Sequence, residues 1–223
     1  MGKQMRQYVE RGHRAVKMGV GRQDKSVDDS AARVREVRET LGAEIDIMVD
    51  AHGTWSVREA QRFARKVEDC DLAWLEEPVS ADNVAGQAEV RVSTDIPLAS
   101  GESEQTRFAF RDLIEARAVD ILQPDVAIAG GITETLRICA LAAAHGLTVA
   151  PHLWGSAILF ASGLHLAAAI PCVTTLELTR GENPLLNELV RERFDLRDGF
   201  VHVSDAPGLG LTLDRDFARS IAV

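Results

Sequence analysis

Cysteine is scarce in this chain, and its few cysteines follow no recognisable binding pattern. Cys70, Cys139 and Cys172 are odd in number, widely spaced and set among apolar residues. Their spacing contains no CxxC pair, so it argues against a zinc ribbon and against the disulfide framework of a small secreted domain. We therefore expect three buried, free thiols in a reducing compartment.

Long apolar runs and an excess of positive charge are also missing. No run approaches the roughly 18–20 apolar residues of a membrane-spanning helix, and the first six residues lack the apolar stretch of a signal peptide. The 34 Asp and Glu outnumber the 25 Lys and Arg, which gives a formal net charge of −9. Phosphate recognition requires clustered Lys and Arg. These absences predict a cytoplasmic protein with no membrane and no nucleic acid as partner.

What the sequence does have is the composition of a globular enzyme and a regular alternation of elements. Its 223 residues are 46% apolar and 26% charged, and a chain of this length can bury a large core. Short apolar runs predict seven strands, over 14–18, 45–50, 72–75, 96–100, 119–122, 147–150 and 174–178. Amphipathic segments predict helices over 27–41, 57–68, 82–92, 107–116, 131–145 and 156–169.

This alternation predicts an α/β fold built from parallel βα units. A repeat of roughly 25 residues favours a (β/α)8-type barrel over an open doubly wound sheet. No Gly-rich phosphate loop follows the first strand, which lowers the prospect of a dinucleotide site. The alternation stops after residue 180, so we expect a barrel domain over 1–182 and a C-terminal tail over 183–223 that packs outside the barrel or on another domain.

Three carboxylates end three successive predicted strands. Asp50 and Glu76 are 26 residues apart, and so are Glu76 and Glu102. Neighbouring strands lie about 4.8 Å apart, so the three side chains can converge, and their mutual repulsion then calls for a cation. Oxygen donors with open positions suit Mg²⁺. The alternative is that each is a solvated acid at a strand end. Their equal spacing argues against this alternative for the three together.

Two later strand ends and an early one carry residues suited to moving a proton. Asp125 follows Gln-Pro, and His152 follows Ala-Pro on the next strand. A carboxylate that holds one imidazole nitrogen fixes the tautomer and raises the basicity of the other, which suits a general base. Lys17 lies near the end of the first strand and can stabilise negative charge on a substrate. The alternatives are a structural loop histidine and a surface lysine.

These motifs resemble the enolase superfamily and, within it, the mandelate racemase subgroup. The resemblance covers roughly residues 10–180. It rests on the segments Ala15-Val16-Lys17-Met18, Val49-Asp50-Ala51, Trp74-Leu75-Glu76-Glu77-Pro78, Ala99-Ser100-Gly101-Glu102, Gln123-Pro124-Asp125, Gly130-Gly131 and Pro151-His152. It implies that Asp50, Glu76 and Glu102 bind Mg²⁺, that Asp125 and His152 form the base dyad, and that Glu177 hydrogen-bonds the substrate carboxylate or enediolate.

The sequence departs from this family in three places. Many members carry a second lysine where this chain has Gly19, so a two-base racemase is disfavoured. His52 stands where relatives often have Asn, as a second proton carrier, a substrate contact or a partner of the metal site. Members also have an N-terminal capping domain and a first barrel strand before the helix that residues 5–12 represent. We expect this chain to lack both. We also expect it to be a poor catalyst alone, and either to be prone to aggregation or to depend on self-association as a homo-oligomer.

The resemblance implies Mg²⁺-dependent removal of the proton α to a carboxylate, through an enediolate. One base suits dehydration of an acid sugar to a 2-keto-3-deoxy acid, which is the leading expectation. A sugar-lactone cycloisomerase is the second reading and a racemase or epimerase is the third. A non-catalytic truncated barrel is an alternative of a different class.

Overall fold

The computed structural model describes residues 1–222 and divides them into two compact units. Unit 1 comprises Met1–Gly101 and Arg111–Ile121, and unit 2 comprises Glu102–Phe110 and the residues from Leu122 onward. Among the described residues, no helix is long and apolar enough to cross a membrane.

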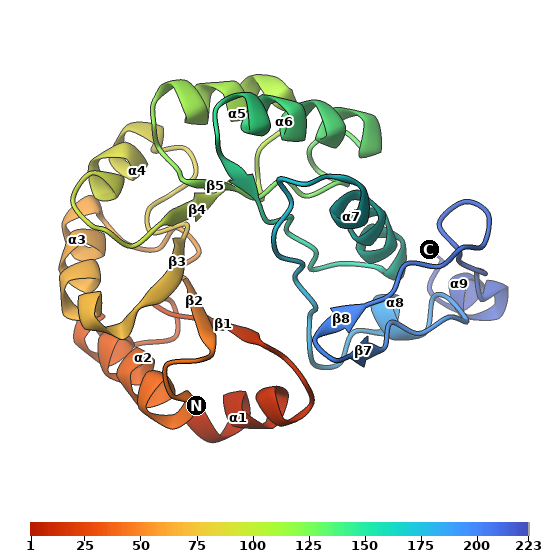
Figure 1. The fold of residues 1–223 in the computed structure, drawn as a ribbon, viewed down its shortest axis with the longest axis horizontal. Coiled ribbons are helices and arrows are strands. Elements are labelled where there is room, and N and C mark those ends of the chain that lie inside the picture. Colours follow the sequence, from red (N-terminus) through yellow and green to blue (C-terminus); the bar gives the residue numbers. More distant parts are fainter. Residues whose placement is uncertain (223) are drawn as a thin grey trace. The chain divides into compact units, whose positions relative to one another are not determined.

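Unit 1 is a run of βα units in which each strand is followed by a helix (Figure 1). Its elements are α1 (Gly2–Glu10), β1 (Ala15–Gly19), α2 (Val27–Leu41), β2 (Asp46–Asp50), α3 (Val57–Lys66), η1 (Glu68–Cys70), β3 (Leu72–Glu76), α4 (Val84–Arg91) and β4 (Leu98–Ser100). Helix α5 (Thr106–Glu115) and strand β5 (Ile121–Leu122) each contribute residues to both units. In Figure 1, helices α2, α3 and α4 lie on one side of strands β1–β4.

The strands of unit 1 pair in parallel, and their register brings their carboxyl ends level. Gly19 pairs with Asp50, Asp50 with Glu76, and Glu76 with Ala99. The strand order of the sheet is β1-β2-β3-β4-β5-β6 across the described residues. Because side chains at the carboxyl ends of parallel strands gather at one edge, this register places Asp50 beside Glu76.

Capping residues start the helices of unit 1 where the sequence predicted. The Ser26 hydroxyl accepts the N–H of Asp29 at the start of α2. Ser56 and Glu59 form a reciprocal capping box on α3, in which the Glu59 carboxylate also accepts the Ser56 N–H. These bonds satisfy N–H groups that a helix leaves unpaired at its first turn. The buried faces of both helices cover the fully buried Val49 and Leu75 of the strands.

Unit 2 continues the pattern and ends in an irregular segment. Its elements are α6 (Ile132–Ala144), β6 (Thr148–Val149), α7 (Ala157–Ala169), α8 (Pro184–Asn187), β7 (Leu196–Arg197), β8 (Phe200–Val201) and α9 (Arg215–Ser220). Strands β7 and β8 form an antiparallel hairpin. The tail packs on α7, since the rings of Phe160 and Phe194 lie 4.5 Å apart between centroids. The domain boundary between residues 182 and 183 stays a prediction.

The strand predicted over 174–178 is wrong. Val173 makes an isolated parallel bridge to Val149, and residues 174–178 form no strand. The Thr174 N–H donates to the Val149 carbonyl, and the ladder stops there. Strand β6 is only two residues long, and Pro151 beyond it has no N–H to offer a neighbour. The other six predicted strands form, with ends shifted by up to two residues.

Candidate active site

Asp50 and Glu76 form a buried pair of carboxylates in unit 1. They end the adjacent strands β2 and β3 and are only 6% and 0% exposed. Burial, and then repulsion from Glu76, raise the pKa of Asp50 to about 6, although the positive charge of Lys17 opposes the shift. Burial and the neighbouring carboxylate therefore both oppose a negative charge on Asp50.

Glu76 is held by one donor on each of its two oxygens. The Lys17 ammonium donates to Oε1 at 2.6 Å, and the indole Nε1–H of Trp74 donates to Oε2 at 3.0 Å. Lys17 was predicted at this edge, whereas the role of Trp74 was not. The signal was available, because residues two apart on a strand share a face, and Trp74 precedes Glu76 by two.

His52 lies against Asp50. Its Nε2 is 3.1 Å from Asp50 Oδ2, and its backbone N–H donates to Oδ1 at 2.9 Å. The backbone of His52 takes a left-handed conformation with φ of 48°, as does Glu77 with φ of 37°. A Cβ added at Gly19 would come within 3.8 Å of the His52 ring. Of the three roles left open for His52, these contacts favour that of a partner to Asp50.

Unit 2 holds the histidine and its carboxylate. His152 Nδ1 lies 2.8 Å from Asp125 Oδ2, and both side chains are largely buried. The other Asp125 oxygen accepts the N–H groups of Ala127 and Ile128 at 2.7 and 3.2 Å. An ionised carboxylate fixed in this way can only accept from the ring, so Nδ1 carries a proton and, in the neutral ring, Nε2 carries the lone pair.

Two further carboxylates of unit 2 surround His152. Its Nε2 lies 3.5 Å from Glu102 Oε2, and Glu177 Oε2 accepts the N–H of the next residue, Leu153, at 2.9 Å. Burial lowers the pKa of His152, but the hydrogen bond with Asp125 and the charges of Glu102 and Glu177 outweigh it, so the pKa is raised. Glu177 reaches this place although the strand predicted around it does not form.

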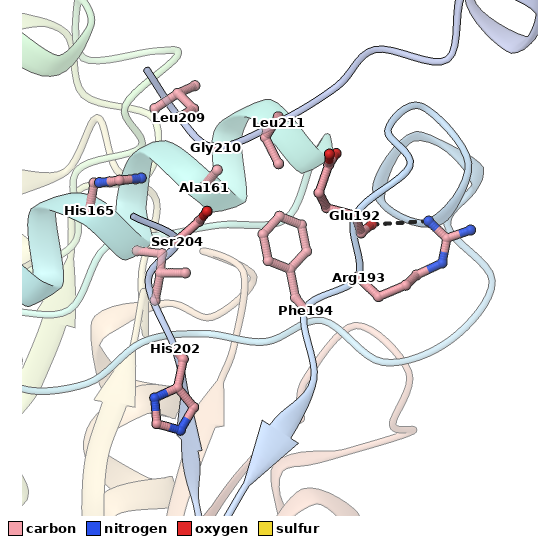
Figure 2. A pocket seen from close by; sticks show the side chains of 11 residues that line it. Ala161, His165, Glu192, Arg193, Phe194, His202, Ser204, Leu209, Gly210 and Leu211 are labelled. Carbon is pink, nitrogen blue, oxygen red and sulfur yellow. Dashed lines mark hydrogen bonds between the residues drawn. The ribbon is translucent and has the colours of Figure 1, made fainter. Parts of the chain in front are cut away.

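The predicted site residues thus fall into two groups of four. Unit 1 brings together Lys17, Asp50, His52 and Glu76, and unit 2 brings together Glu102, Asp125, His152 and Glu177. A separate cavity of about 340 Å³ lies between α7 and the tail of unit 2, lined by Phe194, His165 and His202 among others (Figure 2). None of the eight predicted residues lines it, so the cavity is apart from this chemistry.

Comparison with known proteins identifies the family. Residues 1–217 match the family described as Enolase C-terminal domain-like. The chain belongs to this family. The match extends the resemblance seen in the motifs to nearly the whole chain, including α1 and most of the tail.

The curated relatives act on acid sugars or their lactones. L-talarate/galactarate dehydratase of Salmonella typhimurium is 39% identical over 210 residues, which are 94% of this chain and 50% of that protein. D-galactarolactone cycloisomerase of Agrobacterium fabrum is 33% identical over 209 residues, which are 90% of this chain and 54% of that protein. The chain spans about half the length of these relatives.

A solved structure confirms the predicted fold class. The same Salmonella dehydratase, liganded with Mg and L-lyxarohydroxamate, superimposes with a TM-score of 0.87 at 37% identity. The alignment covers 97% of this chain and 53% of that one. This is the TIM-like α/β barrel fold of the enolase superfamily.

Proposed function

We propose that this chain carries the proton-transfer and metal-binding residues of an acid-sugar dehydratase. The observation that carries the proposal is the His152–Asp125 pair, in which a doubly anchored carboxylate leaves the lone pair of His152 on Nε2. That arrangement suits a general base, because the accepting nitrogen is fixed in tautomer and position. The similarity to a curated acid-sugar dehydratase supports the same reading.

The carboxylates fit a divalent cation. Asp50 and Glu76 are buried side by side, and burial, followed by repulsion from Glu76, raises the pKa of Asp50. Glu102 follows strand β4 by two residues, and β4 pairs with the strand that Glu76 ends. We propose that Asp50, Glu76 and Glu102 hold one Mg²⁺, since Mg²⁺ takes hard oxygen ligands. Once bound, the ion supplies positive charge to the carboxylate of the substrate.

His152 is the group that moves the proton in this proposal. Its Nε2 takes the proton from the carbon α to the substrate carboxylate, and the resulting imidazolium faces the negative charges of Asp125, Glu102 and Glu177. Negative charge that develops on the enediolate faces the Lys17 ammonium. Glu177 hydrogen-bonds the enediolate by accepting from its α-hydroxyl group. The same imidazolium then gives its proton to the departing β-hydroxyl, which leaves as water. The enol left behind tautomerises to the 2-keto-3-deoxy acid.

Cycloisomerisation of a sugar lactone is the second candidate. A curated D-galactarolactone cycloisomerase is among the relatives, and cycloisomerisation is also feasible with limited acid/base equipment. Epimerisation through His52 ranks third, because His52 is engaged by Asp50 and Gly19 offers no side chain for a second base. The alternative of a non-catalytic barrel predicts no exchange of the α-proton under any condition.

The architecture and cell biology of the whole protein are part of the proposal. We propose residues 183–223 as a tail that packs on a capping domain such as the relatives' additional length provides. We also propose that the protein is a cytoplasmic homo-oligomer that binds neither nucleic acid nor membrane.

Exchange of the substrate α-proton with solvent deuterium tests this function. The chain, alone and extended upstream, is incubated in D2O with Mg²⁺ and a panel of acid sugars and followed by proton NMR. We expect exchange and release of a 2-keto-3-deoxy acid, which His152→Asn abolishes. His145→Asn, at an exposed histidine on the end of α6, is the matched control and leaves both unchanged. Exchange at the normal rate in His152→Asn would move the base elsewhere.

A further inference from the structure

Two cysteines meet in an open apolar groove of unit 2, away from the eight residues of the candidate active site. The groove has a volume of about 520 Å³ and lies beside helix α6 and the turn that follows α7. Cys139 and Ala143 line it from the same face of α6, and Pro171 and Cys172 line it from the turn. This surface leaves a route by which a small molecule reaches the sulfurs.

The sulfur of Cys172 points toward Cys139. Its Sγ–H donates to the Cys139 carbonyl oxygen at 3.5 Å, across 33 residues of sequence. Cys139 is buried, whereas Cys172 is half-buried, so the two thiols differ in access to solvent. Burial, and then the proximity of Cys172, raise the pKa of the Cys139 thiol to about 12. Cys172 is therefore the first of the two that a reagent in solvent can meet.

We propose that Cys139 and Cys172 are a reversible oxidation site that closes into an intramolecular disulfide on contact with a small-molecule disulfide such as oxidised glutathione. The thiolate of Cys172 attacks one sulfur of the small disulfide and releases one small thiol. Cys139 then attacks Cys172 Sγ, and its proton passes to the second small thiolate as that group leaves. The two protein thiols lose two electrons and two protons, and the small disulfide is reduced to two thiols.

The disulfide would join α6 to the turn that holds Cys172, and both of these contact strand β6. The Cys172 carbonyl accepts the Val149 N–H, and the Thr174 N–H donates to the Val149 carbonyl, so the turn holding Cys172 is strand β6's hydrogen-bonded neighbour. Helix α6, which carries Cys139, packs against β6. Oxidation would thus link α6 to the turn that pairs with β6. Val149, the residue of β6 that this turn contacts, lies three residues before His152.

The folded chain is incubated with oxidised glutathione, its free thiols are blocked with N-ethylmaleimide, and the mass of the intact protein is measured by mass spectrometry. We expect the number of free thiols to fall from three to one. We expect no glutathione to remain attached. A proteolytic digest of the oxidised protein should contain two peptides joined by a disulfide between Cys139 and Cys172. Reduction with dithiothreitol restores all three thiols. Far-UV circular dichroism before and after oxidation checks that the protein stays folded.

Three single variants separate the proposed steps. Cys139→Ser should trap a stable glutathione adduct on Cys172, and Cys172→Ser should leave Cys139 and Cys70 free. Cys70→Ser removes the buried cysteine of unit 1 and should form the 139–172 disulfide at the wild-type rate. A wild-type chain that keeps three free thiols, or that keeps a glutathione adduct, would overturn the proposal.

Discussion

The Lys17 ammonium lies 2.6 Å from Oε1 of Glu76, one of the three carboxylates proposed to hold Mg²⁺. The Lys17 ammonium thus pairs with an oxygen of a residue that we propose as a ligand of the cation. The Glu76 side chain is almost fully buried and its other oxygen accepts from Trp74, so water does not solvate its charge. Lysine and cation are therefore expected to compete for Glu76 while both favour a negative substrate.

Lys17→Met separates these two roles. We expect Mg²⁺ to bind more tightly to the variant by isothermal titration calorimetry, because a positive charge beside the site is gone. Turnover should nevertheless fall by about 10²–10³-fold, the usual cost of removing a donor that stabilises developing charge. Lys66→Met, which breaks an exposed ion pair with Asp28, is the control and should change neither quantity. Weaker Mg²⁺ binding in Lys17→Met would contradict the competition.

Mg²⁺ should stabilise the folded chain through Asp50. A ligand at 100 times its Kd adds about 2.7 kcal/mol to the free energy of unfolding, and a chain of this size gains roughly 2–4 °C per kcal/mol. We expect a rise in Tm that grows with Mg²⁺ concentration, measured by differential scanning calorimetry and reversed by EDTA. Asp50→Asn should abolish the rise, whereas Asp46→Asn, at the exposed beginning of the same strand, should keep it. An equal rise in both variants would refute the assignment.

Asp125→Asn should impair proton transfer without disturbing the backbone. The amide oxygen can still accept from Ala127 and Ile128, but the amide nitrogen then faces His152 Nδ1 and donates to it. The ring is driven to the tautomer with its proton on Nε2, which cannot accept another. We expect α-proton exchange to slow by roughly 10²-fold or more, within the usual contribution of a general base, with Mg²⁺ affinity unchanged. Normal exchange would show that the tautomer is set elsewhere.

Glu134 should make stability depend on pH in unit 2. Its carboxylate accepts the Arg107 backbone N–H and pairs with the guanidinium of Arg137, and these contacts lower its pKa from the usual 4.5. A lowered folded-state pKa means stability that is present above pH 4.5 and lost as pH falls through the folded value. Urea unfolding should show Glu134→Gln less stable than wild type at pH 7, with the gap closing in acid. Exposed Glu188→Gln is the control.

The βα order and most site residues could be predicted because each depends on local pattern. The apolar strand runs, the amphipathic helix segments and the 26-residue spacing of Asp50, Glu76 and Glu102 can all be read from the sequence. The strand at 174–178 failed because its apolar pattern says nothing about how long its neighbour is, and β6 ends after two residues.

Contacts between distant residues were beyond the sequence analysis. The bond from the Leu153 N–H to Glu177 depends on where two loops meet, not on either loop's composition. The three cysteines looked uniformly buried and isolated, yet Cys172 is half-buried and meets Cys139. The spacing of two residues in the sequence predicts their distance in space only where a regular repeat, such as the βα unit, relates the two.

The left-handed turn after Asp50 restricts which mutations this part of the protein can accept. His52 has φ of 48° and Gly53 has φ of 65°, and a Cβ at Gly53 would stand 3.0 Å from the Ser80 backbone. Asn and Gly tolerate such a φ, whereas β-branched residues do not. In a library of all substitutions, position 53 should stay glycine for steric reasons alone. Position 52 should accept only a small set of residues. The backbone of this turn therefore limits which side chains can be selected beside Asp50, whatever the substrate.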